Sequence, residues 1–182
     1  MSIVIRCIDI SISFTVLVVM SPILGYAILT QNSKQILFIQ MRIGRAQKPF
    51  HIIKFRTMKL ESPNLPTHEV NESLITPIGH FLRRTKLDEL PQFWNVLKGE
   101  MSIVGYRPCL PTQSQLIRMR QDAGIFIDPP GITGIAQMNG CDMSDPVKLI
   151  EIESNQAKNL CLSEYFKIIY GTVVRCILRQ KG

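Results

Sequence analysis

One short run of the sequence brings three cations next to two adjacent carboxylates, and it carries most of the chemistry that the chain offers. The cations are Arg83, Arg84 and Lys86, and the carboxylates are Asp88 and Glu89. Adjacent carboxylates often mark only a solvated helix start, because acids favour helix N-termini. Here a helix that begins near Asp88 is expected to point its amides toward the same place as the cations, so that an anion such as phosphate is held there.

A carboxylate and a bound pyrophosphate are both negatively charged, so the repulsion between them has to be offset. A divalent cation that bridges the carboxylate and the phosphate provides this, and it also polarises the phosphorus for attack. No His or Cys occurs between Arg83 and Gln92, so the ligands on offer are oxygens, which suit Mg2+. We therefore predict a magnesium site at Asp88 and Glu89 that serves a phosphorylated substrate.

The composition limits the partners of this site. Hydrophobic residues make up 46% of the 182 residues, and Lys plus Arg outnumber Asp plus Glu by 21 to 14. This combination indicates contact with lipid and with anions, which include nucleic acid, an anionic membrane and a phosphorylated substrate. A nucleic-acid-binding module needs clustered basic residues with stacking aromatics, whereas the cations here lie mostly beside the Asp88 run and at the flanks of an apolar segment. We therefore expect no nucleic-acid partner.

The five cysteines are scattered, with no Cys-x-x-Cys pair and no His at ligand spacing, so they predict neither a zinc site nor a disulfide framework. This usage favours a reducing compartment.

The apolar segment has no charged residue from Ile10 to Ser33 and predicts contact with a membrane. The Ser21-Pro22 pair lies near its middle, where proline lacks the amide that continues a helix. Each half has about a dozen residues and reaches roughly 16 to 18 Å, against a hydrocarbon core of about 30 Å. Arg6 precedes the segment and Lys34 follows it, so both flanks carry the bias of the cytoplasmic side. These residues leave two alternatives open, a re-entrant helix-break-helix and a single span kinked at proline.

The rest of the chain predicts a mixed fold. Gln35–Ile43 and Phe50–Met58 are rich in Ile and Phe, which predicts two strands joined by a turn. Thr76-Pro77 is typical of a helix start, and the helix expected around Asp88 ends at Lys98-Gly99. We further expect a loop over Glu61–Ser73, a strand over Met101–Gly105, a polar surface helix over Gln113–Gln121 and a C-terminal helix from Leu162 to Ile177. The apolar face of that last helix suits a membrane interface as well as a protein core.

The run from Leu87 to Pro108, LDELPQFWNVLKGEMSIVGYRP, resembles the core signature of the bacterial sugar transferases, specifically the small monotopic phosphoglycosyl transferases. The resemblance covers nearly the whole chain, because further pieces lie in the same order on both sides. Upstream are Asp9-Ile10, Ser21-Pro22, Gln40–Gly44 and Lys54–Met58, and downstream are Pro130–Gly134 and Gln137–Gly140.

The resemblance implies an α+β fold, predominantly helical, in two parts. Residues 1–34 are then a re-entrant membrane anchor broken at Ser21 and Pro22. Residues 35–182 are a cytoplasmic catalytic domain with a short β-sheet and interfacial helices. This domain is expected to lie on the cytoplasmic face of the bacterial inner membrane, in contact with membrane lipids.

The implied activity is transfer of a sugar 1-phosphate from a UDP-sugar to polyprenyl (undecaprenyl) phosphate, with Mg2+ as cofactor. Asp88 is then the nucleophile that attacks the β-phosphate, expels UMP and forms an aspartyl phosphosugar. Glu89 is either the base for the acceptor or a magnesium ligand. Arg107 corresponds to the family's phosphate-binding arginine, and Lys54 and Arg83 match other basic active-site positions. Such a product starts assembly of a glycan (O-antigen, capsule, exopolysaccharide or glycoprotein), with downstream glycosyltransferases as partners.

Three positions depart from the family pattern. Many relatives carry an arginine directly after the Asn139-Gly140 pair, where this chain has Cys141, and an aspartate at the position of Tyr165. Tyr106 stands where proline is common. We place Cys141 among the substrate-binding positions and expect these departures to alter donor preference more than activity. An alternative is a catalytically inactive membrane-bound scaffold of the same fold that recruits glycan-assembly enzymes, against which the intact Asp88-Glu89 pair argues.

Overall fold

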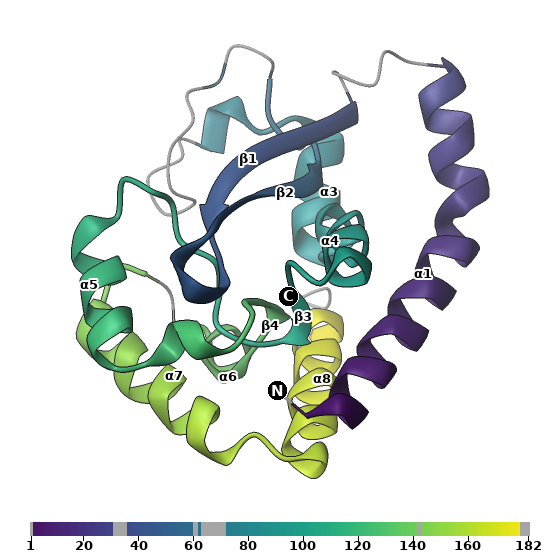
Figure 1. The fold of residues 1–182 in the computed structure, drawn as a ribbon. Coiled ribbons are helices and arrows are strands. Elements are labelled where there is room, and N and C mark those ends of the chain that lie inside the picture. Colours follow the sequence, from purple (N-terminus) through teal and green to yellow (C-terminus); the bar gives the residue numbers. More distant parts are fainter. Residues whose placement is uncertain (1, 31–35, 60–61, 63–71, 142, 179–182) are drawn as a thin grey trace.

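The computed structural model describes residues 2–30, 36–59, 62, 72–141 and 143–178, and these are mostly helical (Figure 1). The α-helices are α1 (Ile3–Thr30), α3 (Pro77–Thr85), α4 (Gln92–Lys98), α5 (Ser114–Asp122), α6 (Ile135–Asn139), α7 (Pro146–Asn159) and α8 (Leu162–Leu178). The strands are β1 (Leu37–Ile43), β2 (Pro49–Phe55), β3 (Ser102–Val104) and β4 (Gly131–Thr133). Short 3-10 helices lie at Arg45–Gln47, Glu72–Leu74, Leu87–Glu89 and Ile125–Ile127. The predicted predominance of helix is confirmed.

Strands β1 and β2 form an antiparallel hairpin in which Leu37 pairs with Phe55 and Ile43 with Pro49. Its inner face contributes Ile52 to the core. The two strands expected from the Ile- and Phe-rich runs are therefore confirmed. Of the loop expected over 61–73, nearly all lies outside the described residues.

Strand β3 pairs in parallel with β4, with Ser102 opposite Gly131. The prediction of a single short sheet is therefore wrong, because the described chain holds two separate two-stranded sheets. β4 has only three residues and lies between a Pro-Pro pair and Gly134, which the local pattern marks as chain breaks. Its partner is far away in the sequence, and backbone bonds such as Gly105 N to Thr133 O at 2.8 Å form only after the chain has folded.

Two buried clusters hold the segment that leads to Arg107. The first joins α1, the hairpin, α4 and α8, and it includes Ile103 of β3. The second lies among α5, α6 and α7 and includes Tyr106 and Cys109. The chain between Ile103 and Cys109 passes from one cluster to the other, so the backbone of Arg107 is held from both sides.

Helix α1 is one helix of 28 residues that passes through Ser21 and Pro22. The predicted helix-break-helix at this pair is therefore wrong for the described structure. Pro22 has no amide to donate to the Val18 carbonyl, but the Ser21 hydroxyl donates to that carbonyl at 2.8 Å, so the acceptor keeps a partner. Figure 1 shows a ribbon that bends part-way along its length but stays helical. Residues Ile3–Pro22 are long and apolar enough to cross a bilayer by length and composition.

The first turns of α1 pack directly against the rest of the molecule. Arg6 donates from Nη1 to the Val96 carbonyl at 2.7 Å and from Nη2 to the Leu97 carbonyl at 3.0 Å. These carbonyls lie in the last turn of α4, where Val96 O also accepts the amide of Gly99 at 3.0 Å, so Arg6 adds two charged hydrogen bonds to the C-terminal end of that helix. Farther along α1, Phe14 and Val19 are 61% and 67% exposed, which leaves an apolar face on the outside.

Helix α8 has two apolar faces. Tyr165 and Ile168 are fully buried, whereas Phe166, Tyr170 and Val173 are exposed. The apolar residues expected to share one face are therefore split between the core and an outer surface. One side of the helix packs in the core, as one of the two alternatives predicts, and the other side presents apolar groups outward. Contact of that outer side with a membrane interface stays a prediction.

Candidate active site

The two carboxylates lie between the end of α3 and the start of α4. Helix α3 begins as predicted, because the Thr76 hydroxyl accepts the amide of Gly79 at 3.1 Å. It ends at Lys86, whose positive φ of 62° turns the chain in a conformation that non-glycine residues adopt only at a cost. The 3-10 turn that follows holds both Asp88 and Glu89, and both are buried.

The helix expected to begin near Asp88 begins later. Helix α4 starts at Gln92 with Pro91 as its N-cap, and its amides are not placed at Asp88 as the sequence suggested. The turn before it is held by short-range bonds, including Leu90 N to the Leu87 carbonyl at 3.2 Å. The neighbouring cations Lys54, Lys86 and Arg107 supply positive charge at the carboxylates.

Glu89 is the centre of a buried ion network. Lys54 Nζ on β2 donates to its Oε1 at 2.8 Å, and both terminal nitrogens of Arg107 lie 3.4 Å from the same oxygen. Burial alone raises the pKa of Glu89, but the charges of Lys54, Arg107 and Lys86 outweigh burial and hold that pKa below its usual range. Glu89 is therefore an anion at neutral pH, and three residues predicted as site members are brought together.

Asp88 differs from its neighbour in both contacts and charge. Its Oδ1 is buried and has no hydrogen-bond partner among the described residues. Burial, and next the charge of Glu89, raise the pKa of Asp88 above its usual range, although Lys54, Lys86 and Arg107 oppose them. The pKa of Asp88 is thus raised and the pKa of Glu89 is lowered. Such opposite shifts occur in sites where one acid acts as a reactive group and the other as a fixed charge.

Arg83 and Arg42 flank this centre. Arg83 donates from Nε to the Thr57 hydroxyl at 2.9 Å, and the charge of Asp88 acts on its guanidinium. Arg42, on β1, donates to the Pro108 carbonyl at 3.2 Å. Burial, followed by the charge of Arg107, lowers the pKa of Arg42 to about 10, so it stays a cation at neutral pH.

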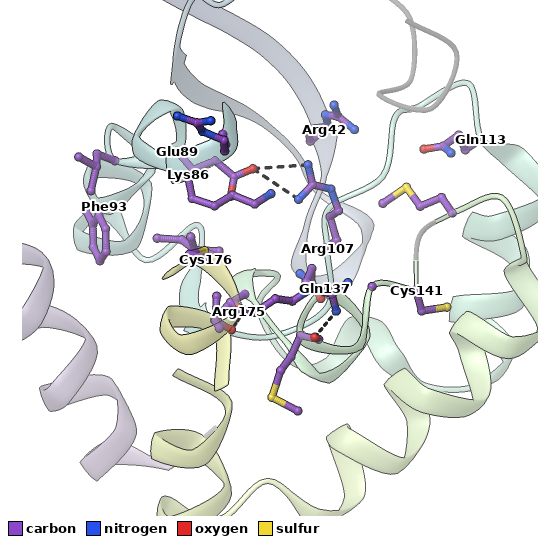
Figure 2. A pocket seen from close by; sticks show the side chains of 18 residues that line it. Arg42, Lys86, Glu89, Phe93, Arg107, Gln113, Gln137, Cys141, Arg175 and Cys176 are labelled. Carbon is purple, nitrogen blue, oxygen red and sulfur yellow. Dashed lines mark hydrogen bonds and ion pairs between the residues drawn. The ribbon is translucent and has the colours of Figure 1, made fainter. Parts of the chain in front are cut away.

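A cavity of about 410 Å³ opens beside the carboxylates. Its wall includes the basic residues Arg42, Arg84, Lys86, Arg107 and Arg175, against the single described acid Glu89. Figure 2 shows Glu89, Lys86 and Arg107 on one side of the cavity and Arg175 on the other. This excess of cations suits a ligand with more than one negative charge.

The predicted site residues divide into two groups around this cavity. Glu89, Arg107 and Cys141 belong to its wall, whereas Asp88, Lys54 and Arg83 are not among the residues that line it. Asp88 is nevertheless within the field of the same cations.

Sequence reasoning did not assign Arg42 or Arg175 to the site, and it used Arg84 and Lys86 only as neighbours of Asp88. The sequence does contain a signal for Arg42, because it lies within the Gln40–Gly44 motif, although its charge is also explained by its place after the apolar segment. Arg175 had none, since it lies on the C-terminal helix far from every motif.

Tyr165 lies outside the site. It is fully buried and donates its hydroxyl hydrogen to Asp9 of α1 at 2.7 Å, and it is absent from the cavity wall. The structure gives Tyr165 a packing role between α8 and α1, and its effect on donor choice stays a prediction. Cys141 remains a candidate, because it does line the cavity.

The donor set for magnesium consists of oxygens. Among the described residues there is no cluster of three or more His, Cys, Asp or Glu side chains that could hold a metal ion alone. Asp88 offers a buried oxygen with no partner, and Mg2+ commonly binds through one or two carboxylates together with substrate phosphates. The residues present thus fit a magnesium ion that shares its ligands with a bound substrate.

A profile of the family described as bacterial sugar transferase matches residues 1–179, almost the whole chain. The chain belongs to the bacterial sugar transferase family. The match includes the hairpin, the carboxylate turn and the helix that carries Arg175, and it confirms the resemblance found in the sequence.

Several members of this family have names that specify a reaction. A UDP-glucose:undecaprenyl-phosphate glucose-1-phosphate transferase of Klebsiella pneumoniae is 39% identical over 186 residues, which is 96% of this chain and 40% of the relative. An undecaprenyl-phosphate galactose phosphotransferase of Salmonella typhimurium is 32% identical over 97% of this chain and 41% of its own length. The chain therefore spans about two fifths of the length of these transferases.

A relative of similar length is the exopolysaccharide production protein PSS of Rhizobium leguminosarum bv. phaseoli. It is 33% identical over 202 residues, which is 97% of this chain and 96% of the relative. A chain of about this size is thus found among the bacterial sugar transferases, next to the longer relatives.

Proposed function

We propose that this bacterial sugar transferase is an enzyme that moves a sugar 1-phosphate from a UDP-sugar to undecaprenyl phosphate and releases UMP. The observation that carries the proposal is the buried Asp88-Glu89 pair, in which the pKa of Asp88 is raised and that of Glu89 is lowered, beside a cavity rich in cations. Relatives named as UDP-sugar and undecaprenyl-phosphate transferases supply the substrate classes. The product is expected to start assembly of a surface glycan, on which downstream glycosyltransferases act.

In the proposed first step, the Asp88 carboxylate attacks the β-phosphorus of the donor. The bond between that phosphorus and the oxygen bridging to the α-phosphate breaks, and its electron pair leaves with UMP. An aspartyl phosphosugar remains on the enzyme. In the second step, an oxygen of the polyprenyl phosphate attacks the same phosphorus and returns Asp88 as a carboxylate. Splitting the transfer in this way lets one site handle a soluble donor and a lipid acceptor in turn.

The neighbours of Asp88 hold the charges that such a transfer needs. Arg107 is exposed enough to meet a phosphate and grips Glu89 only at 3.4 Å, so its planar guanidinium has donors left for two phosphate oxygens. Lys54, which is buried against Glu89, fixes that carboxylate in place. Glu89 then acts as a base on the acceptor or as a ligand of the metal.

Magnesium is the proposed cofactor, held by Asp88 and Glu89. When bound, it supplies charge neutralisation and polarisation at the donor pyrophosphate. The turn between α3 and α4 buries both of the carboxylates that would hold the ion.

The enzyme is further proposed to lie on the cytoplasmic face of the bacterial inner membrane, with residues 1–34 as a re-entrant anchor. The support is that cations flank the apolar segment on both sides and that α1 lacks one backbone bond at Pro22, the place where a bend costs least. The outer apolar face of α8 suits contact with lipid.

Mass spectrometry of the intact protein tests the covalent route. The purified enzyme is incubated with Mg2+ and a panel of UDP-sugars, without lipid acceptor, and UMP release is followed in parallel. We expect a sugar-phosphate adduct that maps to Asp88, with up to one UMP per enzyme, and neither in Asp88→Asn. Full turnover by Asp88→Asn overturns the mechanism. No UMP from any donor in the presence of polyprenyl phosphate favours the inactive scaffold.

A further inference from the structure

Arg175 brings a cation from α8 into the active-site cavity, on the side away from Glu89. Its side chain is part of the cavity wall, together with Gly140 and Cys141 of the turn that follows α6. Figure 2 shows the guanidinium at the base of the cavity, facing the region below Arg107. A cation in this place is separate from the group that surrounds the two carboxylates.

The contacts of Arg175 hold its guanidinium against the turn. Nη1 donates to the Met138 carbonyl at the end of α6. Gly140 has a φ of 74°, which favours glycine, and a Cβ added there would displace the guanidinium from its present place. Nearby, the hydroxyls of Thr133 and Thr172 lie 2.7 Å apart and tie α8 to β4. Arg175 is thus placed by the fold and does not reach the cavity as a loose surface side chain.

Arg175 supplies a positive charge beside the turn that follows α6, which has no cation of its own at position 141. Position 141, where the resemblance described above implies an arginine, is a cysteine in this chain. In the part of the chain that the structure describes, no carboxylate lies within ion-pair distance of Arg175, whereas Arg107 on the opposite wall is shared with Glu89. A ligand with two phosphates would meet Arg107 at one end and Arg175 at the other.

We infer that Arg175 binds the phosphate of the nucleotide that leaves, so that α8 supplies the cation that position 141 does not. This rests on the proposed function. When the bond between the two donor phosphates breaks, the bridging oxygen takes the electron pair and the nucleotide phosphate becomes a dianion. A guanidinium beside it stabilises the charge that develops and holds the nucleotide product.

Binding of UMP, measured by calorimetry on the full chain in nanodiscs, tests this without turnover. Arg175→Gln should bind UMP about 10- to 100-fold more weakly than the parent, as expected for loss of one hydrogen-bonded charge. It should also raise KM for the UDP-sugar. Lys167→Gln is the matched control, because it removes the same charge from the exposed side of α8 and should change neither value.

A second variant tests whether the two positions share one role. In the Arg175→Gln background, Cys141→Arg returns a cation to the adjacent turn and should recover most of the lost UMP affinity. Recovery supports the inference even if Arg175→Gln is less stable, because a folding defect is not repaired by a charge at 141. Equal UMP affinity of Arg175→Gln and the parent, or no recovery in the double variant, overturns it.

The two proposals fail in different ways. Absence of UMP release by the parent enzyme from every UDP-sugar refutes the transferase and leaves the binding comparison intact. A parent that turns over normally, with Arg175→Gln unchanged in KM and in UMP binding, refutes only the role of Arg175.

Discussion

Tyr165 on α8 donates its hydroxyl hydrogen to Asp9 on α1 at 2.7 Å, and both side chains are fully buried. The same carboxylate accepts the Ser102 hydroxyl at 2.8 Å and the Ile103 amide at 3.0 Å. A single buried acid of the apolar helix is thus satisfied by α8 and β3 together. Because an unpaired buried carboxylate is costly, these bonds fix the register of α1 against α8 and β3.

Removing the Tyr165 hydroxyl should therefore loosen the joint between α1 and α8. We expect Tyr165→Phe to lower the free energy of unfolding by about 1 to 3 kcal/mol, because Asp9 loses one of three donors in a buried place. Tyr170→Phe, on the exposed face of the same helix, serves as the control and should be neutral. Thermal unfolding in detergent measures both. Equal melting temperatures for the two variants would show that the Asp9 bond carries no stability.

This joint also shows where sequence reasoning reached its limit. Tyr165 was recognised as a departure from the family pattern, but a pattern along the chain does not reveal that its partner is Asp9, at the other end of the sequence. Local signals did predict local structure. The Thr76 cap of α3 and the β1-β2 hairpin depend on neighbouring residues and were both found correctly.

The parts that were missed depend on contacts between distant segments. Strand β4 exists because β3 lies beside it, and α1 stays helical at Pro22 because the hydroxyl of Ser21 replaces a missing amide. The cavity was predicted in part, through Glu89 and Arg107, whereas Arg175 enters it only after α8 has packed against α6.

Stability should depend on pH through Asp88 in a defined direction. Its pKa is raised in the folded state, so between the ordinary Asp pKa and the raised value the folded protein binds more protons than the unfolded chain. The free energy of unfolding then falls as pH rises through that window, and the charged Asp88 costs stability at neutral pH. We expect Asp88→Asn to melt at a higher temperature than the parent at pH 7, with the difference lost in acid. If Asp88→Asn melts at a lower temperature than the parent at pH 7, the predicted direction of this effect is wrong.

Glu89 should behave in the opposite way. Its pKa is held low by Lys54 and Arg107, so its charge stabilises the fold above the ordinary Glu pKa, and this contribution is lost as pH falls toward the lowered value. Glu89→Gln is therefore expected to be less stable than the parent at pH 7. For the reaction, a Glu89 that mainly activates the acceptor leaves up to one UMP per enzyme, whereas a Glu89 that mainly holds Mg2+ impairs both steps. Thermal melts and single-turnover UMP release separate these roles.

The fully buried pair of Arg120 on α5 and Glu153 on α7 gives a second measure of stability. Arg120 donates to both Glu153 oxygens, at 2.9 and 2.7 Å, and the guanidinium carbon lies 4.9 Å from the centre of the Tyr106 ring. Glu153→Gln leaves a buried cation without its counter-charge and should cost about 3 to 5 kcal/mol. Glu164→Gln, which breaks an exposed pair with Lys167, should cost less than about 1 kcal/mol. Denaturant unfolding measures the free energy of unfolding of both variants. If the two variants lose similar amounts, the buried pair stabilises the fold no more than the exposed pair does.

Donor choice should respond to the turn that carries Cys141. A bulky cation placed there by Cys141→Arg enters the wall of the cavity beside Arg175, and the two like charges compete for the same end of the donor. We expect the variant to change the relative kcat/KM among UDP-sugars while its membrane association stays the same. UMP release with a panel of donors, each compared with the parent, gives the ratios. The same ranking with the same ratios would remove position 141 from donor recognition.

The orientation of the apolar segment is tested by thiol labelling at its two flanks. If residues 1–34 are re-entrant, Ser2 and Lys48 lie on the same, cytoplasmic side, whereas a span separates them. Both positions are exposed, so a single cysteine at either one is open to reagent. The background replaces Cys7, Cys141, Cys161 and Cys176 by alanine and keeps Cys109, which is fully buried and should not react.

Spheroplasts are treated with a maleimide that does not cross membranes, before or after lysis. Because both flanks carry cations that favour the cytoplasm, we expect Ser2→Cys and Lys48→Cys to be protected in intact spheroplasts and to be labelled after lysis. The cysteine-depleted parent reports any reaction of Cys109, and a periplasmic cysteine protein confirms that the reagent reached the outer face. Labelling of Ser2→Cys from outside, with Lys48→Cys protected, would mean that α1 crosses the bilayer as the single helix seen in the structure.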